Sequence, residues 1–462
     1  MPMKKMTSKI ILLLILLFNS NSVFASGAEG TEHVLPNPFM VLPFAILLLM
    51  IATGPLFYHH FWERNYPKVA LFLGSITVVY YLVFLNDTYS LIHTLAEYIS
   101  FIALLASLFV ASGGILIKVD KKSTPMLNVA ILLFGAVISN IIGTTGASML
   151  LIRPYIKVNK NRIKPYHIIF FIFSVSNIGG ALDPIGDPPL FLGFLRGIGF
   201  FWFFEHIILV WIPTLIALMA IFYFIDSRNK VEDNESYSGK IEFKGGKNII
   251  YLAIILLSVF IDPGIISWVP SLAPLPFGLR EIIMFTVTYL SFKTADKKIL
   301  QSNEFDFEPI KEVAYLFIGI FATMIPALQL IAHESKMYGQ QLNPGVFYWA
   351  TGILSAILDN APTFLNFLSA ALGKYGMDVN VKQQVFDFSL TYPIYVQAIS
   401  IAAVFFGAMT YIGNGPNFMV KSICERAGIK MPSFFGYLMK YSIPILLPIF
   451  FIIWLLVFYG RV

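Results

Sequence analysis

Long apolar stretches separated by short polar or charged segments run along most of the chain. A helix needs about 20 residues to cross the hydrocarbon core of a bilayer, and most of the stretches approach or exceed that length. Lipid offers no partner for backbone N–H and C=O groups, so a segment that spans it forms a helix. The pattern therefore predicts an all-α polytopic membrane protein, with apolar stretches at 37–58, 69–86, 96–117, 127–152, 166–195, 199–225, 247–265, 277–292, 312–332, 345–372, 391–420 and 437–459.

The first residues are typical of a secretory signal peptide, predicted here as residues 1–25. A basic segment with three lysines, 1–9, precedes a short apolar run, 10–18. Residues 23–25, with the sequence VFA, then fit a small-residue cleavage site. Cleavage after Ala25 would leave the mature N-terminus outside the cytoplasm of a bacterium. The alternative is an uncleaved first helix.

Basic loops of a membrane protein face the cytoplasm, and this rule creates a conflict around the stretch 127–152. Lysines at 118–122 precede the stretch, and the most basic loop of the chain, 153–164, follows it. Both ends therefore belong inside, so we predict that the stretch enters the membrane, turns and returns as a re-entrant helical hairpin. Glycines and hydroxyls at 139–146 would supply the turn, and irregular backbone at that depth needs protein or water around it.

The second half of the chain contains a comparable stretch. Residues 345–372 have weakly charged flanks and are interrupted by the polar run 359–362, with the sequence DNAP. We interpret them as a second re-entrant hairpin that enters from the outside. The charged segment 226–246 is predicted to be a cytoplasmic linker, which separates a first transmembrane repeat, 26–225, from a second, 247–462.

Two short sequence frames indicate that the two halves are related. Residues 180–191, GALDPIGDPPLF, line up with residues 407–418, GAMTYIGNGPNF, and each copy follows a hairpin candidate. Because the halves start on opposite faces of the membrane, we predict an inverted repeat with two broken transmembrane helices, 166–195 and 391–420. Such repeats are typical of secondary transporters, whose broken helices meet near the bilayer midplane and form the binding site.

Composition narrows the class of protein further. Hydrophobic residues make up 57% of the chain and charged residues 13%, whereas soluble domains average roughly 45–50% and 25%. These values exclude a water-soluble enzyme, a disordered chain and a fibrous protein. The net charge of +6 is expected in the cytoplasmic loops, so the predicted partner is the lipid bilayer and not a nucleic acid. We find no nucleophile–base arrangement or nucleotide motif, and we expect no cofactor beyond transported ions.

Residues 131–195 and 350–420 resemble the ion transporter superfamily, chiefly through the runs 139–148, SNIIGTTGAS, and 413–418, GNGPNF. The closest likeness is to the branch that holds citrate transporter-like proteins and bacterial sodium/proton antiporters of the D type. The resemblance implies an elevator-like movement, the bacterial inner membrane and, for many members, a homodimer. The family's Ser-Asn-Thr signature is only partly kept, because Asp359 stands in the second hairpin. An acid there is more similar to the antiporter and arsenite branches than to the dicarboxylate symporters.

Acidic residues inside the apolar stretches are the leading candidates for ion binding. A charge inside a membrane segment is costly unless it is solvated or paired, so Asp359, Asp183 and Asp187 are functional candidates by default. Each of them also stands where it could cap a half-helix, and this structural role is the alternative.

Neutral oxygens that suit a hard cation complete the predicted site. They belong to Asn140, Asn360, Asn414, Asn417, Thr144 and Thr363. Among them, Asn140 and Asn360 join Asp359 as predicted sodium ligands. Their alternative role is to satisfy backbone groups that the broken helices leave open.

The function that these residues predict is sodium/proton antiport. Sodium and protons would compete for one buried carboxylate, for which Asp359 is the leading candidate and Asp183 and Asp187 are its partners. The alternative is a cation-coupled transporter of citrate, a dicarboxylate or another small anion. No Arg or Lys lies inside the hairpins or the broken helices, which disfavours a trianion, although helix N-termini and amides also hold carboxylates.

Overall fold

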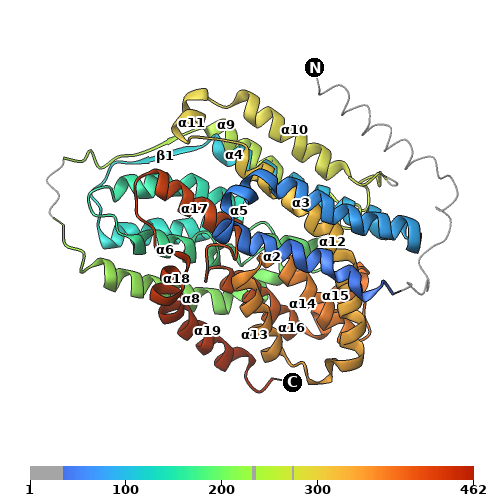
Figure 1. Ribbon diagram of the computed structural model, residues 1–462. Helices are drawn as coiled ribbons and strands as arrows, with labels where there is room; N and C mark the ends of the chain where they lie inside the picture. The colour runs from blue at the N-terminus through green and yellow to red at the C-terminus, as the bar shows by residue number, and fades with distance from the viewer. Residues whose placement is uncertain (1–34, 232–235, 273–274, 462) are drawn as a thin grey trace. The chain divides into compact units, whose positions relative to one another are not determined.

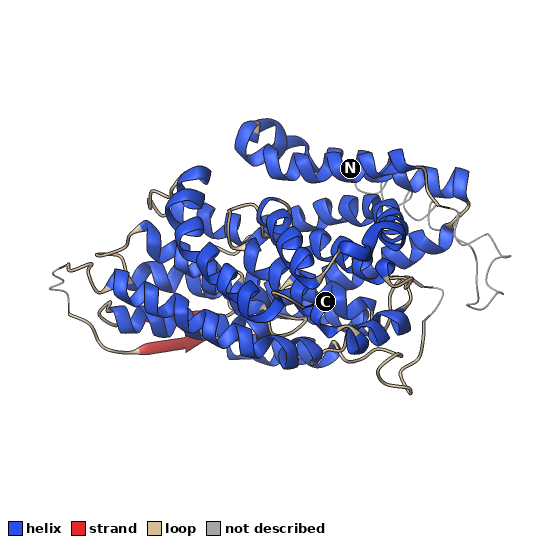
Figure 2. Ribbon diagram, turned by 90° about the horizontal axis from the view of Figure 1, so that it is seen from below, coloured by secondary structure: helices blue, strands red, loops and turns tan. Residues whose placement is uncertain are grey.

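The computed structural model describes residues 35–231, 236–272 and 275–461. The predicted signal peptide, residues 1–25, lies outside the described residues. All described helices and strands fall within one compact unit, Pro36–Val462. Figure 2 shows that helices make up nearly all of this unit and that a strand lies at one edge, where two short strands pair.

Most of the predicted apolar stretches form helices at the expected places (Figure 1). The helices of the first half are α2 (Leu42–Phe57), α3 (His59–Tyr80), α4 (Thr88–Gly113), α5 (Pro125–Val158), α6 (Pro165–Ser174), α7 (Pro188–Arg196) and α8 (Trp202–Asp226). Those of the second half are α9 (Gly246–Ser258), α10 (Leu279–Thr294), α11 (Lys297–Ser302), α12 (Glu308–Tyr338), α13 (Pro344–Ile357), α14 (Asn360–Lys374), α15 (Lys382–Thr391), α16 (Pro393–Gly407), α17 (Gly415–Arg426), α18 (Phe434–Tyr437) and α19 (Leu447–Ile453). Short π-helical turns continue α3, α18 and α19, at Tyr81–Leu85, Leu438–Leu446 and Trp454–Phe458.

Seven helical segments in the described part of the chain are long and apolar enough to cross a membrane. They are Pro38–Pro55, His59–Leu85, Thr88–Gly113, Pro125–Val158, Trp202–Asp226, Glu308–Tyr338 and Phe434–Phe458. The remaining predicted stretches contain shorter helices, and three of them, 166–195, 345–372 and 391–420, are divided by a break. The chain is therefore a multi-pass helical membrane protein, as the hydrophobic pattern predicts.

Helix α5 is long enough to span a membrane, but it does not run straight. Gly143 interrupts it with φ 75° and ψ 156°, a conformation that is open essentially to glycine alone. Residues 31 positions apart in a straight helix would be separated by roughly 46 Å. Instead, Asn128 Nδ2 donates a hydrogen bond to Asn159 Oδ1 over 2.9 Å. The segment therefore doubles back at Gly143, and its two ends meet.

Helices α13 and α14 form a similar pair. The chain turns at Leu358–Asp359, and the Asp359 side chain accepts a hydrogen bond from Ala361 N at the start of α14. At the far end, Lys374 Nζ donates to the carbonyl oxygen of Leu342 over 2.8 Å, although the two residues are 32 positions apart. Both predicted hairpin stretches thus fold back on themselves.

The breaks in the two other interrupted stretches lie inside the protein. Helix α6 precedes the first break and α16 precedes the second, and nearly every residue of both helices is buried. α16 packs against α13 and α14, which lie together in Figure 1. Because protein surrounds the breaks, their open backbone groups find partners away from lipid.

One pair of strands departs from the all-α prediction. β1 (Leu116–Val119) pairs with β2 (Ile241–Lys244) in an antiparallel sheet. β2 belongs to the segment 226–246, so this segment does more than link two halves. Beside the sheet, Ser238 donates from both N and Oγ to Asp120 Oδ2, and these hydrogen bonds lower the pKa of the Asp120 carboxyl. The backbone hydrogen bonds between the two strands give the charge-rich segment a defined structure.

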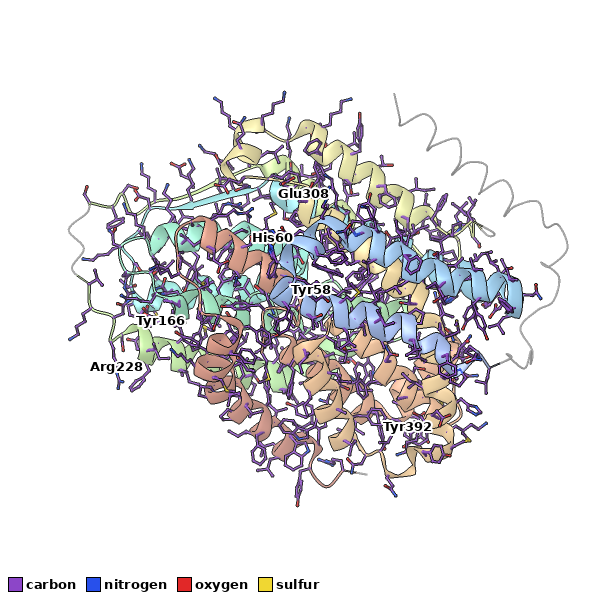
Figure 3. All side chains as sticks on the ribbon, viewed as in Figure 1. Tyr58, His60, Tyr166, Arg228, Glu308 and Tyr392 are labelled. Atoms are coloured by element: carbon purple, nitrogen blue, oxygen red, sulfur yellow. The ribbon has the colours of Figure 1, made fainter. Side chains whose placement is uncertain are left out.

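A buried polar cluster ties the ends of the first hairpin to the end of α8. The Asp226 carboxylate is fully buried and accepts two hydrogen bonds from the Arg162 guanidinium, at 2.9 and 3.0 Å. Tyr166, labelled in Figure 3, donates to it over 2.7 Å, and Asn128 donates over 3.0 Å. His167 Nε2 lies 3.1 Å from the same carboxylate. These contacts fix the base of the hairpin.

We predict that Arg162→Met strongly destabilises the protein. The substitution leaves the Asp226 charge buried without its cation, which costs about 3–5 kcal/mol. The measurement is the melting temperature of the detergent-purified variant. Lys311→Met is the matched control, because it removes a lysine from an exposed ion pair with Glu308 and should leave the melting temperature nearly unchanged. Equal melting temperatures for the two variants would contradict a structural role for the buried pair.

Candidate functional site

The two sequence frames form the same turn in the two broken stretches. Asp183 Oδ1 accepts hydrogen bonds from the backbone N–H groups of Ile185 and Gly186, at 2.9 and 3.0 Å. At the matching positions, Thr410 Oγ1 accepts from Ile412 N and Gly413 N, at 3.3 and 3.2 Å. A side chain three positions before the glycine that the two frames share thus closes each turn.

A pair of glycines makes the same close approach in each frame. A Cβ atom built on Gly186 would lie 2.2 Å from the carbonyl oxygen of Gly180. One built on Gly413 would lie 2.6 Å from the carbonyl oxygen of Gly407. Both distances are far below normal contact, so both positions require glycine for a packing reason. The geometric match between the halves agrees with the sequence match.

The two turns bring Asp187 to the centre of a polar network. Asp187 is 1% exposed. Its Oδ1 accepts hydrogen bonds from Thr144 Oγ1 at 2.8 Å and from Asn414 Nδ2 at 2.9 Å, and its Oδ2 accepts from Asn360 Nδ2 at 2.6 Å. The donors come from the first doubled-back segment, the second one and the second broken stretch. Parts of the chain more than 200 residues apart therefore meet at one carboxylate.

Four helix starts meet in this network. Thr144 begins the second leg of α5 after the turn at Gly143, and Asn360 is the first residue of α14. Asp187 directly precedes α7, and Asn414 directly precedes α17. The N-terminus of a helix carries about half a positive charge. The site therefore favours negative charge. None of the ion pairs in the described residues includes Asp187, so the helix N-termini and neutral donors are what surround its carboxylate.

Unlike Asp359, Asp187 and Asn414 have side chains that do not cap the helices that follow them. Both residues occupy the N-cap position with extended backbone, yet neither side chain bonds to its own helix. Asn360 adds a further unusual atom, since its Oδ1 is buried and has no hydrogen-bond donor in the described part of the chain. An unpartnered amide oxygen beside a carboxylate is a suitable pair of ligands for a cation.

The remaining acidic candidates act as caps. The Asp359 side chain caps α14 through Ala361 N, and Asp183 closes its own turn. Asp359 has no hydrogen bond to Asp187 among those of the described residues. The contacts of Asp183 and Asp359 are therefore those of capping residues, whereas the contacts of Asp187 are not.

The other predicted amides and hydroxyls mostly satisfy backbone groups. Asn140 Nδ2 donates to the carbonyl oxygen of Gly179 over 2.7 Å, and its Oδ1 accepts from Leu182 N over 3.0 Å. Asn417 Nδ2 donates over 2.8 Å to the carbonyl oxygen of Gly407. Thr363 Oγ1 donates to the carbonyl oxygen of Asp359 in its own helix. These side chains hold the broken backbone in place and do not reach Asp187.

Asn177 is a member of the network that the sequence reasoning missed. Its Nδ2 donates to Asn417 Oδ1 over 2.6 Å, and its Oδ1 accepts from Asn414 Nδ2 over 3.2 Å. Asn177 thus joins the first broken stretch directly to the second. The signal available in the sequence was an amide in the middle of the apolar stretch 166–195.

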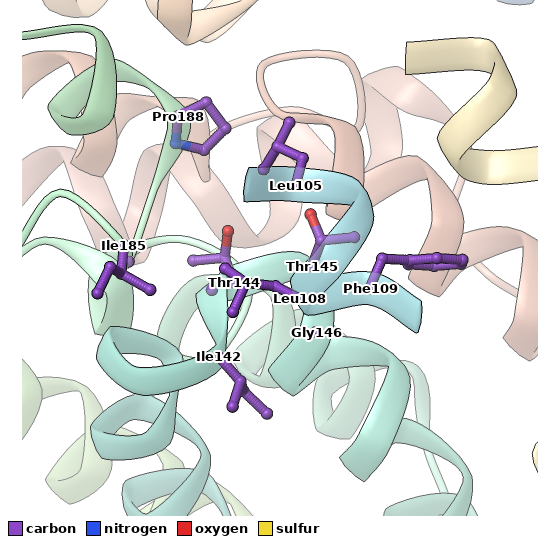
Figure 4. A pocket seen from close by; sticks show the side chains of 11 residues that line it. Leu105, Leu108, Phe109, Ile142, Thr144, Thr145, Gly146, Ile185 and Pro188 are labelled. Carbon is purple, nitrogen blue, oxygen red and sulfur yellow. The ribbon is translucent and has the colours of Figure 1, made fainter. Parts of the chain in front are cut away.

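A small pocket borders the network on one side (Figure 4). Leu105 and Leu108 of α4 line one wall, and the hairpin turn with Thr144 and Thr145 lines another. Ile185, Gly186 and Pro188 close it, so the pocket borders both neighbours of Asp187 and one of its donors.

The architecture and the site are those of a multi-pass helical membrane protein with a polar site at interrupted helices. Residues 34–458 match the model of the family described as "Putative citrate transport", and the chain belongs to that family. A search of curated proteins gives no match. Family and architecture together support a secondary transporter rather than an enzyme.

We predict that Gly143→Ala disturbs the turn of the first doubled-back segment. Alanine strongly disfavours φ 75° with ψ 156°, and its Cβ would lie 3.3 Å from the Ile185 carbonyl oxygen. The expected cost is about 1–3 kcal/mol, measured as a lowered melting temperature. Gly246→Ala is the control, because that glycine has open space around its Cβ position. A Gly143→Ala protein as stable as the Gly246→Ala protein would contradict the turn.

Proposed function

We propose that this chain is a sodium/proton antiporter in which Asp187 is the carboxylate for which the two cations compete. The observation that carries the proposal is the arrangement of Asp187: it is buried, has three neutral donors and no basic partner in the described residues, and does not cap its own helix. Burying a charge without a counter-ion is expensive. A bound sodium ion or proton removes that cost.

Competition at one site gives coupling. When sodium occupies the carboxylate, the proton leaves, and when the proton returns, sodium loses its charged ligand. Each cation thus lowers the affinity for the other, as linkage requires. The unpartnered Asn360 Oδ1 supplies a second oxygen for sodium.

We further propose that the two doubled-back segments are re-entrant hairpins and that the halves 26–225 and 247–462 are inverted repeats. The paired turns at Asp183 and Thr410, with their matched glycine contacts, support a repeat. The charge of the flanking loops supports the opposite orientation of the halves in the membrane. Inverted repeats allow the same site to face either side in turn. The proposed location is the inner membrane of a bacterium.

We predict that Asp187→Asn abolishes antiport. The amide keeps the size of the side chain but removes the charge, so sodium and protons no longer compete for it. The measurement is proton release from acid-loaded proteoliposomes on addition of sodium, followed with a pH-sensitive dye. The flux of Asp187→Asn should fall to the level of protein-free vesicles.

Asp183→Asn and Asp359→Asn are matched controls for that experiment. Asparagine caps turns and helices about as well as aspartate, so both variants should keep the flux within about twofold of wild type. Loss of flux in Asp359→Asn with retention in Asp187→Asn would move the coupling role to Asp359. Full flux in all three variants would refute a carboxylate-coupled antiporter.

A second candidate function is cation-coupled transport of citrate or another small carboxylate. The family description favours it, and so do the four helix N-termini, which attract negative charge. Thr145 lines the pocket beside them and is partly exposed. A carboxylate substrate near Asp187 would require cations to bind first, because two negative charges would otherwise repel each other.

Ligand-dependent stabilisation separates the two candidates. A ligand that binds only the folded protein stabilises it by about 2.7 kcal/mol at 100 times its Kd. For the antiporter, we predict that sodium raises the melting temperature of the wild type but not of Asp187→Asn, and that citrate adds nothing. Further stabilisation by citrate only in the presence of sodium would support the coupled carboxylate transporter instead. Stabilisation by citrate alone, equal in both proteins, would contradict a cation at Asp187.

A further inference from the structure

We infer that the first turns of α3 form a binding site for a divalent transition-metal ion of the zinc type, separate from the Asp187 network. Its ligands are His59, His60 and Glu63, whose donor atoms all lie within 4.8 Å of one another. All three side chains are exposed, so the site is open to ions in solution. None of the three contacts the residues around Asp187.

The spacing of the ligands suits a metal on a helix. His59 and Glu63 are four positions apart and lie on the same helical face, and His59 Nε2 is 3.3 Å from Glu63 Oε1. Zinc binds imidazole nitrogen and carboxylate oxygen at about 2.0–2.2 Å, so two of its ligands stand roughly 3.3–3.5 Å apart in a tetrahedral site. The observed separation already has this value. His60 needs only a side-chain rotation to complete the set.

Negative charge from α12 adds an independent reason for a cation at this position. α12 packs against α3. The charges of Glu63 and Glu308 both act on the Glu312 carboxylate, which places three acidic groups near one another. Lys311 pairs with Glu308, whereas Glu312 has no ion pair in the described residues. Figure 3 labels His60 and Glu308 where α3 and α12 begin. Carboxylates beside two imidazoles favour a divalent cation at this position.

Three protein ligands leave the fourth position of a tetrahedral ion to water. A site of this kind needs no change in the backbone, because all the ligands belong to one helix. A bound ion would also reduce the repulsion among the acidic groups of α3 and α12. We therefore expect metal binding to stabilise this pair of helices without altering ion transport.

The test uses the full-length protein, purified in detergent without a polyhistidine tag and titrated with cobalt(II). Tetrahedral cobalt has intense visible absorption, so the spectrum reports the geometry of the site as well as its occupancy. We expect one cobalt ion to give this spectrum and zinc to displace it. His59→Gln and Glu63→Gln should weaken binding by about tenfold or more, which corresponds to roughly 1.4 kcal/mol.

His333→Gln is the matched control. His333 is a partly exposed histidine on the same α12 helix, roughly 37 Å along the helix axis from Glu308. This variant should bind cobalt like the wild type, and all three variants should keep the wild-type melting temperature without metal. The inference is overturned if the wild type binds no cobalt, or if His59→Gln and Glu63→Gln bind it as tightly as His333→Gln does. Because the readout is a spectrum, its outcome does not depend on the proposed antiport.

Discussion

A carboxylate inside an apolar protein stays charged only if donors or a cation replace the water it has lost. Asp187 meets this condition through Thr144, Asn360 and Asn414, each from a different part of the chain. Hydrogen bonds to a charged group contribute about 1.5–3 kcal/mol each. Their sum is small against the cost of desolvating an ion, and the helix N-termini around the site supply the further positive potential. The breaks and turns of the chain place these donors and helix N-termini around the carboxylate.

The breaks follow directly from local chemistry. Helices α7 and α17 begin with Pro188 and with Gly415 followed by a proline, and the residue before each of these two helices has extended backbone. Pro188 sets the first helical position of α7 and has no N–H to satisfy. The side chains that precede α7 and α17 are therefore released from capping and face the network. Interrupted helices, which would be unfavourable in lipid, are tolerated because α6 and α16 are buried within protein.

The sequence predicted the members of the network better than their roles. Thr144, Asn360, Asp187 and Asn414 all follow from polar groups inside apolar stretches. The sequence places Asp359 ahead of Asp187, but the choice between capping a helix and facing a cation depends on backbone angles that composition does not determine. The strand pair escaped prediction, since each strand has only four residues. Arg162 and Asp226 escaped as partners because 64 residues separate them.

The two doubled-back segments are held at their bases by interactions of unequal strength. A buried ion pair with a two-hydrogen-bond guanidinium fixes the first, whereas a lysine bound to a carbonyl and to the Tyr395 hydroxyl fixes the second. At their turns, both segments are bonded to the broken stretches. Thr144 contacts the first broken stretch through its backbone N–H and its hydroxyl, and Asn360 contacts it through one amide hydrogen bond. The second segment is also bonded to the second broken stretch, because Ser355 Oγ donates to the Ala403 carbonyl oxygen and the Ala356 carbonyl oxygen accepts from Thr410 Oγ1. Asp187 is therefore held by donors from segments that are themselves anchored at both their bases and their turns.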